Sequence, residues 1–154
     1  MNDSSITFSP RGEKSLLEEG NVFMPKFDSE TGLIPCIAQD AHSGEVLMFA
    51  FMNELSLKKS IETGEAHYFS RSRNKLWKKG EQSGHTQRIV ELKTDCDQDV
   101  VLIRVDTCGA AACHVGYTSC FFRKITSLGE NPDLTLLTDP SGKQFDPNEV
   151  YGKK

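Results

Sequence analysis

Short apolar runs separated by turn residues dominate the chain from residue 33 onward. The runs 33–39 and 45–52 flank a turn-forming stretch at 40–44 that holds Asp, His, Ser and Gly. This arrangement predicts a β-hairpin. Asn53 then offers a helix N-cap and Gly64 a C-terminal glycine, so the intervening good helix formers predict a helix.

Further strands are predicted at 66–70, 88–94, 100–106 and 118–125. The run VVLIRV within the third of these is apolar enough that we expect it to be buried on both faces. The glycine-punctuated basic stretch 71–86 is expected to be a loop. These elements predict an α+β fold, mostly β-strands with one or two helices.

A length of 154 residues fits a single domain, 1–154, that can bury a core. The pattern of short apolar runs separated by turn residues covers 31–125, which we take as the core of the domain. The segment 1–30 is expected to be peripheral, with a short helix near residues 16–19. The extension 126–154 is rich in Pro, Asp and Gly, so it is also expected to be peripheral.

Composition is that of an ordinary globular protein, with 37% hydrophobic and 26% charged residues and a net charge of −4. This charge gives no general attraction to nucleic acid or to an anionic membrane, so neither is an expected partner. No apolar run approaches the roughly 20 residues of a membrane span, and the first residues lack a signal-peptide layout. We therefore expect a cytoplasmic protein whose five cysteines are thiols or metal ligands.

Three cysteines, Cys96, Cys113 and Cys120, occur in the motifs DCDQD, ACHVG and SCF. Their spacing is neither the paired CxxC of a zinc ribbon nor that of four close ligands. Three thiolates would instead hold Zn²⁺ with a fourth position open for water. The alternative is that they are isolated core cysteines, and the roles of Cys36 and Cys108 stay open.

Asp95, Asp97 and Asp99 alternate through the same DCDQD motif. In an extended strand they would share one face, opposite Cys96. If the segment bends, their carboxylates can converge on a hard cation such as Mg²⁺ or Ca²⁺. The alternative is an acidic turn that points into solvent.

His114 directly follows Cys113 and is the candidate catalytic acid or base. An imidazole titrates near neutral pH and so can accept and return a proton. A structural, hydrogen-bonding histidine is the competing interpretation.

The basic loop SRSRNKLWKKGEQSGHTQ carries the candidate substrate-binding residues. Its cations and hydroxyls suit phosphate oxygens, and its tryptophan can stack on a base. Neither GxxxxGK[ST] nor GxGxxG occurs, so a P-loop or Rossmann site is not indicated. An exposed cationic loop with one core tryptophan is the alternative. The candidates are Arg71, Arg73, Trp77, Lys79, Glu81, Ser83 and Gly84.

Taken together, these segments resemble the phosphoribosyl-AMP cyclohydrolase family of histidine biosynthesis. The resemblance rests on an ordered series of stretches within about 32–123: GLIPCIAQDAHSGEVLMFAFMNE, ETGEAHYFSRSR, LWKKGEQSGHTQ, DCDQD and CHVGYTSCFFR. It implies hydrolysis of the N1–C6 bond in the adenine ring of phosphoribosyl-AMP by a zinc-activated water.

The resemblance also implies a set of ligands and an assembly. Zinc would be held by the three cysteines named above, and magnesium by the three aspartates. Family members are intertwined homodimers, so Cys96 of one subunit would join Cys113 and Cys120 of the other at a shared zinc site.

Three other classes remain as alternatives. A zinc-stabilised, non-catalytic binding module would need a fourth protein ligand, for which Cys108 is available. A zinc nucleoside deaminase would carry H-x-E…P-C-x-x-C, which is absent. An iron–sulfur protein would usually need four tightly spaced cysteines.

Overall fold

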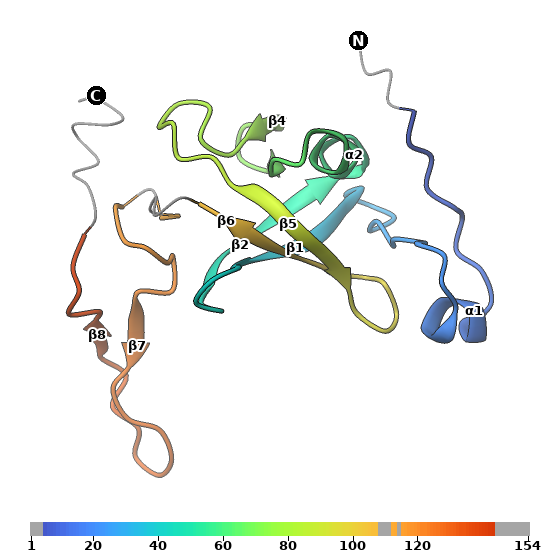
Figure 1. Cartoon of the computed structure of the whole chain (residues 1–154). Coiled ribbons are helices and arrows are strands. Elements are labelled where there is room, and N and C mark those ends of the chain that lie inside the picture. Colours follow the sequence, from blue (N-terminus) through green and yellow to red (C-terminus); the bar gives the residue numbers. More distant parts are fainter. Residues whose placement is uncertain (1–4, 108–111, 114, 144–154) are drawn as a thin grey trace.

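A computed structural model describes residues 5–107, 112–113 and 115–143. They form a mixed fold, mostly strands with two helices, which confirms the predicted α+β class (Figure 1). No helix in these described ranges is long and apolar enough to cross a membrane. The elements are α1 (Lys14–Glu19), β1 (Leu33–Asp40), β2 (Val46–Asn53), α2 (Glu54–Thr63), β3 (His67–Ser70), β4 (Lys75–Lys78), β5 (Arg88–Thr94), β6 (Val101–Asp106), β7 (Arg123–Ile125) and β8 (Leu136–Thr138).

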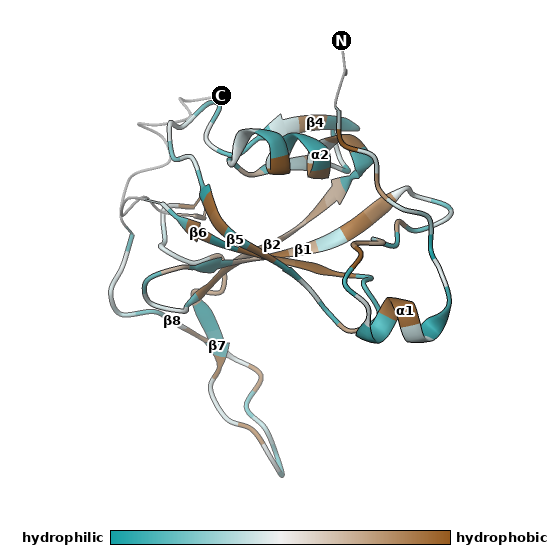
Figure 2. Ribbon diagram, turned by 45° about the vertical axis from the view of Figure 1, so that its right-hand side comes forward, coloured by the Kyte–Doolittle hydropathy of each residue, from teal (hydrophilic) through white to brown (hydrophobic). Residues whose placement is uncertain are grey.

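A four-stranded sheet in the order β2-β1-β6-β5 is the centre of the molecule. The hairpin β1–β2 is antiparallel, as predicted, whereas β6 pairs in parallel with β1 and antiparallel with β5. Helix α2 and the small β3–β4 sheet lie over one face of this sheet (Figure 1). The apolar side of α2 is turned toward the sheet, and Leu57 is fully buried there (Figure 2).

The predicted helix after β2 is confirmed, with both predicted ends. Asn53 Oδ1 accepts a 2.8 Å hydrogen bond from the Ser56 amide, and the Asn53 amide donates one of 2.8 Å to Ser56 Oγ. This reciprocal pair satisfies two polar groups at the helix start. Gly64 ends the helix with a φ of 73°, a conformation that glycine adopts without steric cost.

Strand β6 is buried on one face only, so the expectation of burial on both faces is wrong for the single chain. Val101, Ile103 and Val105 are fully buried against the layer of α2 and β3. Leu102 and Arg104, which point the other way, are partly exposed. The alternation follows because neighbouring strand residues face opposite sides and the chain covers one side of the sheet.

Two expectations about loops and strands need correction. The basic stretch predicted as a loop contains β4, which pairs antiparallel with β3 from His67↔Lys78 to Ser70↔Lys75. The strand predicted at 118–125 is only the three-residue β7, which pairs with β8 from the C-terminal extension. The β7–β8 hairpin projects away from the central sheet and is exposed (Figure 1).

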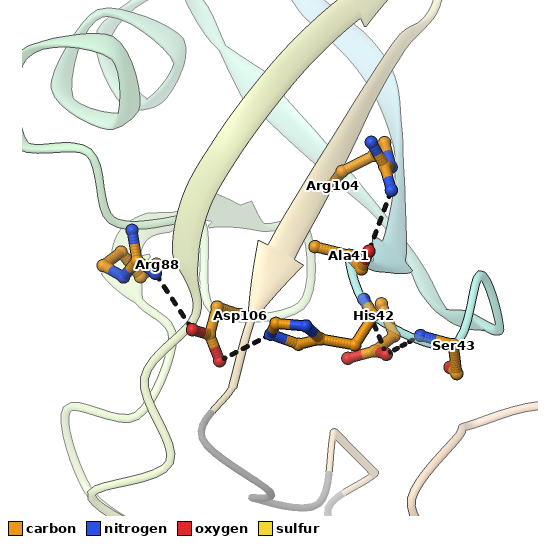
Figure 3. A network of polar contacts seen from close by, with 7 residues as sticks. Ala41, His42, Ser43, Arg88, Arg104 and Asp106 are labelled. Carbon is orange, nitrogen blue, oxygen red and sulfur yellow. Dashed lines mark hydrogen bonds and ion pairs between the residues drawn. The ribbon is translucent and has the colours of Figure 1, made fainter.

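A polar network anchors the end of β6, just before the segment that carries Cys113 and Cys120 (Figure 3). Asp106 accepts a 2.9 Å ion-paired hydrogen bond from Arg88 on β5 and lies 3.6 Å from His42 in the β1–β2 turn. Arg104 donates a 2.8 Å hydrogen bond to the Ala41 carbonyl oxygen. These contacts hold the hairpin turn against the strand that leads to the site.

Candidate active site

Cys113 and Cys120 lie side by side, close enough for the Cys113 thiol to raise the pKa of Cys120. The backbone fixes both: the Cys120 amide donates to the Leu47 carbonyl oxygen at 2.6 Å, and the Cys113 amide to that of Tyr117 at 3.1 Å. Desolvation, and then the neighbouring thiol, raise the pKa of Cys120 to about 12. The Cys120 thiol therefore resists ionisation unless a cation lies beside it.

Lys79 is buried next to this pair. Its ammonium donates a 2.6 Å hydrogen bond to the Ala112 carbonyl oxygen and lies 5.9 Å from the centre of the Trp77 ring. Burial lowers the pKa of Lys79, while the two cysteines act in the opposite direction. This placement puts Lys79 beside the thiols and not beside the carboxylates.

A cavity of about 430 Å³ opens at the thiol pair. Five of the seven predicted substrate-binding residues line it together with Cys120: Arg73, Trp77, Lys79, Glu81 and Ser83. Gly84 lies in the adjoining turn, where its φ of 80° requires glycine-like freedom. The tryptophan packs against Tyr68 with 5.2 Å between ring centres, so its ring is fixed at the cavity wall.

The DCDQD segment bends, and its three carboxylates converge. Asp95, Asp97 and Asp99 each offer an oxygen within 4.8 Å of the other two. Asp97 Oδ1 is buried and has no hydrogen-bond partner among the described residues. Desolvation, followed by the other two carboxylates, raises the pKa of Asp99. An orphaned oxygen within a self-repelling oxygen cluster fits a hard cation such as Mg²⁺.

A groove connects the thiols to the carboxylates. A middle cavity shares Phe49, Ala50 and Trp77 with the thiol cavity. The middle cavity also shares Phe51 and Arg71 with a third cavity, of about 430 Å³, that Asp99 lines. The groove therefore runs along β2, with Cys120 at one end and Asp99 at the other.

Arg71 stands at the junction between the middle cavity and the carboxylate end. Its guanidinium lies 4.3 Å from the centre of the Phe51 ring, which keeps the charge over the groove. Lys26 and Thr31 also line the carboxylate end, and sequence reasoning missed both. No local motif marks them, since they reach the groove only through the path of the N-terminal segment.

The two phenylalanines of β2 were also missed as groove residues. Phe49 and Phe51 stand two positions apart on an edge strand, with their ring centres 5.2 Å apart. Phe49 is 49% exposed despite its size. The available signal was a phenylalanine at every second position of the predicted strand, which places both rings on one face.

One predicted zinc ligand, Cys96, is not brought to the thiol pair. Among the described residues, the only group of three or more metal-ligating side chains is the aspartate cluster, so Cys96 does not join Cys113 and Cys120 within one chain. Cys96 is exposed on the acidic loop. His114 and Cys108 lie outside the described residues, so their expected roles stay predictions.

A groove that joins a thiol pair to a carboxylate cluster, lined by arginine, lysine and tryptophan, indicates an enzyme acting on a small anionic molecule. Comparison with known proteins defines this class further. A family model described as phosphoribosyl-AMP cyclohydrolase matches residues 48–122, which contain most of the groove.

Similar proteins extend this match over most of the chain. A phosphoribosyl-AMP cyclohydrolase of Rhodopseudomonas palustris (strain TIE-1) is 54% identical over 137 residues, covering 89% of each chain. One from strain BisB18 is 53% identical over 147 residues, which is 96% of this chain and 99% of that protein. One from Bradyrhizobium diazoefficiens is 54% identical over 89% of this chain and 95% of its own. The chain belongs to the phosphoribosyl-AMP cyclohydrolase family, a family of hydrolytic enzymes.

Proposed function

We propose that this chain hydrolyses the N1–C6 bond of the adenine ring in phosphoribosyl-AMP, the third step of histidine biosynthesis. The activity follows from the family, and the groove is the observation that supports its assignment to particular residues. A nucleotide with phosphates at both ends needs a long site with one reacting centre and cations near the charged ends. The groove offers Cys120 at one end, Asp99 at the other, and Arg71 and Arg73 along its length.

The purine would lie at the thiol end. Trp77 presents a fixed, partly buried ring on which a base can stack. Phe49 adds a second apolar wall. The ring carbon C6 would then face Cys120, while Arg71 holds a phosphate toward the carboxylates. Fixing the substrate at both ends keeps C6 in a reactive position.

The reaction adds one water across one C–N bond, with no change in oxidation state. The water oxygen bonds to C6, which becomes tetrahedral; the N1–C6 bond then breaks and N1 takes a proton. His114 is the proposed carrier of that proton. Lys79, with its ammonium beside Cys113 and Cys120, offsets part of the negative charge that the ionised thiols bring.

Two metal ions complete the proposal. Cys96, Cys113 and Cys120 would hold Zn²⁺, which when bound would lower the pKa of a water and so supply the nucleophile. Asp95, Asp97 and Asp99 would hold Mg²⁺ for a substrate phosphate. The adjacent thiols and the converging carboxylates fit these two kinds of ion, because thiolates select zinc and carboxylates select magnesium.

The zinc site is proposed to be shared between the subunits of a homodimer. Within one chain Cys96 lies apart from the thiol pair, so the third sulfur would come from a second copy of the chain. Exposed apolar residues near the thiol segment support such an assembly, since a lone chain leaves them in water. They are Val46, Phe49, Phe121, Ile125, Leu136 and Leu137.

The direct test is to incubate the purified protein with phosphoribosyl-AMP and follow ring opening by absorbance. Turnover is expected, together with its loss after removal of zinc by a chelator and its return when zinc is added. Cys120→Ala should lose zinc and turnover together. Cys36→Ala removes a thiol buried in the core, outside the groove, and should keep its zinc content. Full turnover in verified zinc-free protein would refute the mechanism.

A further inference from the structure

The acidic loop is attached to the N-terminal segment through one buried side chain, Gln98. This residue stands between Asp97 and Asp99 and is only 5% exposed. Its backbone adopts a φ of 55°, a left-handed conformation that is uncommon for a long side chain. Such strain persists only where the surroundings fix it, and it tends to occur at functional sites.

All the polar groups of the Gln98 side chain are satisfied by the N-terminal segment. Its Oε1 accepts a 2.7 Å hydrogen bond from the Met24 amide. Its Nε2 donates to the carbonyl oxygens of Leu17 at 3.0 Å and Val22 at 3.2 Å. A buried amide with all its bonds made fixes position strongly, because breaking any one leaves a desolvated group unpaired.

The backbone of the loop is held from the same side. The Lys26 amide donates a 2.8 Å hydrogen bond to the Gln98 carbonyl oxygen. Arg11 donates through Nη1 to the carbonyl oxygens of Asp97 at 2.8 Å and Met24 at 3.0 Å. The guanidinium thus ties together the two stretches of backbone that Gln98 joins.

The contacts with the N-terminal segment keep the three carboxylates of the loop close together. Three like charges within 4.8 Å repel one another, so in the absence of a cation they favour a more open loop. Inside the loop, Asp95 Oδ1 accepts from the amides of Asp99 at 3.0 Å and Val100 at 3.4 Å, and the Gln98 amide donates to the Asp95 carbonyl oxygen at 3.1 Å. These local bonds do not by themselves hold all three carboxylates together. The contacts to residues 11–26 hold the loop closed from outside.

We propose that Gln98 is a positioning residue for the carboxylate cluster, and that the N-terminal segment 11–26 thereby forms part of the cation site. The proposal rests on the proposed function of that cluster as a Mg²⁺ site. Gln98 touches neither substrate nor metal: it acts by keeping three oxygens at the separation that one ion needs. Residues supporting metal ligands in this way typically change metal affinity by about 10–100-fold when replaced.

The test uses Mn²⁺ as a paramagnetic probe, titrated into the full-length protein and followed by electron paramagnetic resonance. Gln98→Met keeps the length of the side chain and the net charge but removes its three hydrogen bonds. Gln39→Met is the matched control, since Gln39 makes one hydrogen bond in the β1–β2 turn, at the far end of β1. The dissociation constant is expected to rise about tenfold or more in Gln98→Met and by less than about twofold in Gln39→Met.

The outcomes separate this inference from the function on which it rests. Tight binding by the wild type together with equal binding by folded Gln98→Met would overturn the positioning role alone. If the wild type does not bind Mn²⁺, or if Asp97→Asn binds it equally well, the cation site itself fails and the inference fails with it.

A second variant covers the case in which Gln98→Met does not fold. Arg11→Gln leaves Gln98 in place and removes only the guanidinium between the two stretches of backbone. Hydrogen exchange at the amides of Asp99 and Val100 is expected to accelerate about fivefold or more, because the loop opens more often. Lys14→Gln, an exposed cation on α1, serves as the control. Unchanged protection in Arg11→Gln would refute the anchoring.

Discussion

Lys79 donates a 2.6 Å hydrogen bond to the carbonyl oxygen of Ala112, 33 residues further along the chain. The bond joins the basic stretch after β4 to the segment that carries Cys113. The ammonium is buried with its charge beside two thiols, which is stable only because that carbonyl and the thiols compensate it.

Replacing Lys79 should therefore damage the thiol site. In Lys79→Met the Ala112 carbonyl oxygen loses its partner, at a cost of about 1–3 kcal/mol in stability. Zinc content and turnover should fall together, turnover by about 10–100-fold. Metal analysis and steady-state kinetics measure both. Lys75→Met, an exposed cation of β4, should behave as the wild type.

The shared zinc site can be tested by complementation. Cys96→Ala and Cys113→Ala chains should each be inactive alone. In a mixed dimer, one site would combine the intact Cys96 of one chain with the intact Cys113 and Cys120 of the other. About half of the wild-type activity per dimer is then expected. A verified heterodimer without any activity would exclude ligation across subunits.

The carboxylate cluster should lower the stability of the metal-free protein. The pKa of Asp99 is raised, so its ionised form is disfavoured in the fold and destabilises the protein at neutral pH. Asp99→Asn should stabilise the metal-free protein at pH 7, by less than about 1 kcal/mol because the site is open to water. It should also weaken Mg²⁺ binding.

The stability difference between Asp99→Asn and the wild type should depend on pH. As the pH falls through the raised pKa, wild-type Asp99 becomes neutral and regains stability. The advantage of Asp99→Asn in denaturant unfolding should therefore shrink on acidification. An advantage that grows toward low pH would contradict the assignment.

Arg71 should act on substrate binding more than on the chemical step. Its guanidinium lies over Phe51 at the carboxylate end, away from Cys120. Arg71→Gln is expected to raise KM about tenfold, the loss of one charge-assisted contact, with a smaller change in kcat. Lys93→Gln, which removes an exposed cation of β5 outside the groove, is the control. An equal fall in kcat with unchanged KM would argue against phosphate binding.

The β7–β8 hairpin should contribute to assembly. Ile125 and Leu136 pair directly across it and are about half exposed. Replacing both by serine removes apolar area that a second copy would cover, so sedimentation should show a dimer dissociation constant about tenfold higher or more. Leu128→Ser, also exposed but outside the paired strands, should have little effect.

Much of the central fold could be predicted because its signals are local. The hairpin β1–β2 follows from two short apolar runs around a turn, and helix α2 from the Asn53 cap and Gly64; each signal acts within a few residues. β4 was missed because its short basic sequence carries no strand pattern of its own. It forms a strand through its hydrogen bonds with β3. The same holds for β8, which forms only because β7 lies beside it.

The sequence by itself determined the chemical inventory: thiols suited to zinc, carboxylates suited to magnesium, and a basic stretch suited to phosphate. It left open whether the DCDQD segment is extended or bent, because both conformations satisfy the same local pattern. The tertiary structure decided that question, since the buried amide of Gln98 gains its hydrogen bonds only when the N-terminal segment lies against the loop. Long-range packing likewise placed Lys79 beside the thiols and Lys26 at the carboxylate end, positions that no spacing along the chain encodes.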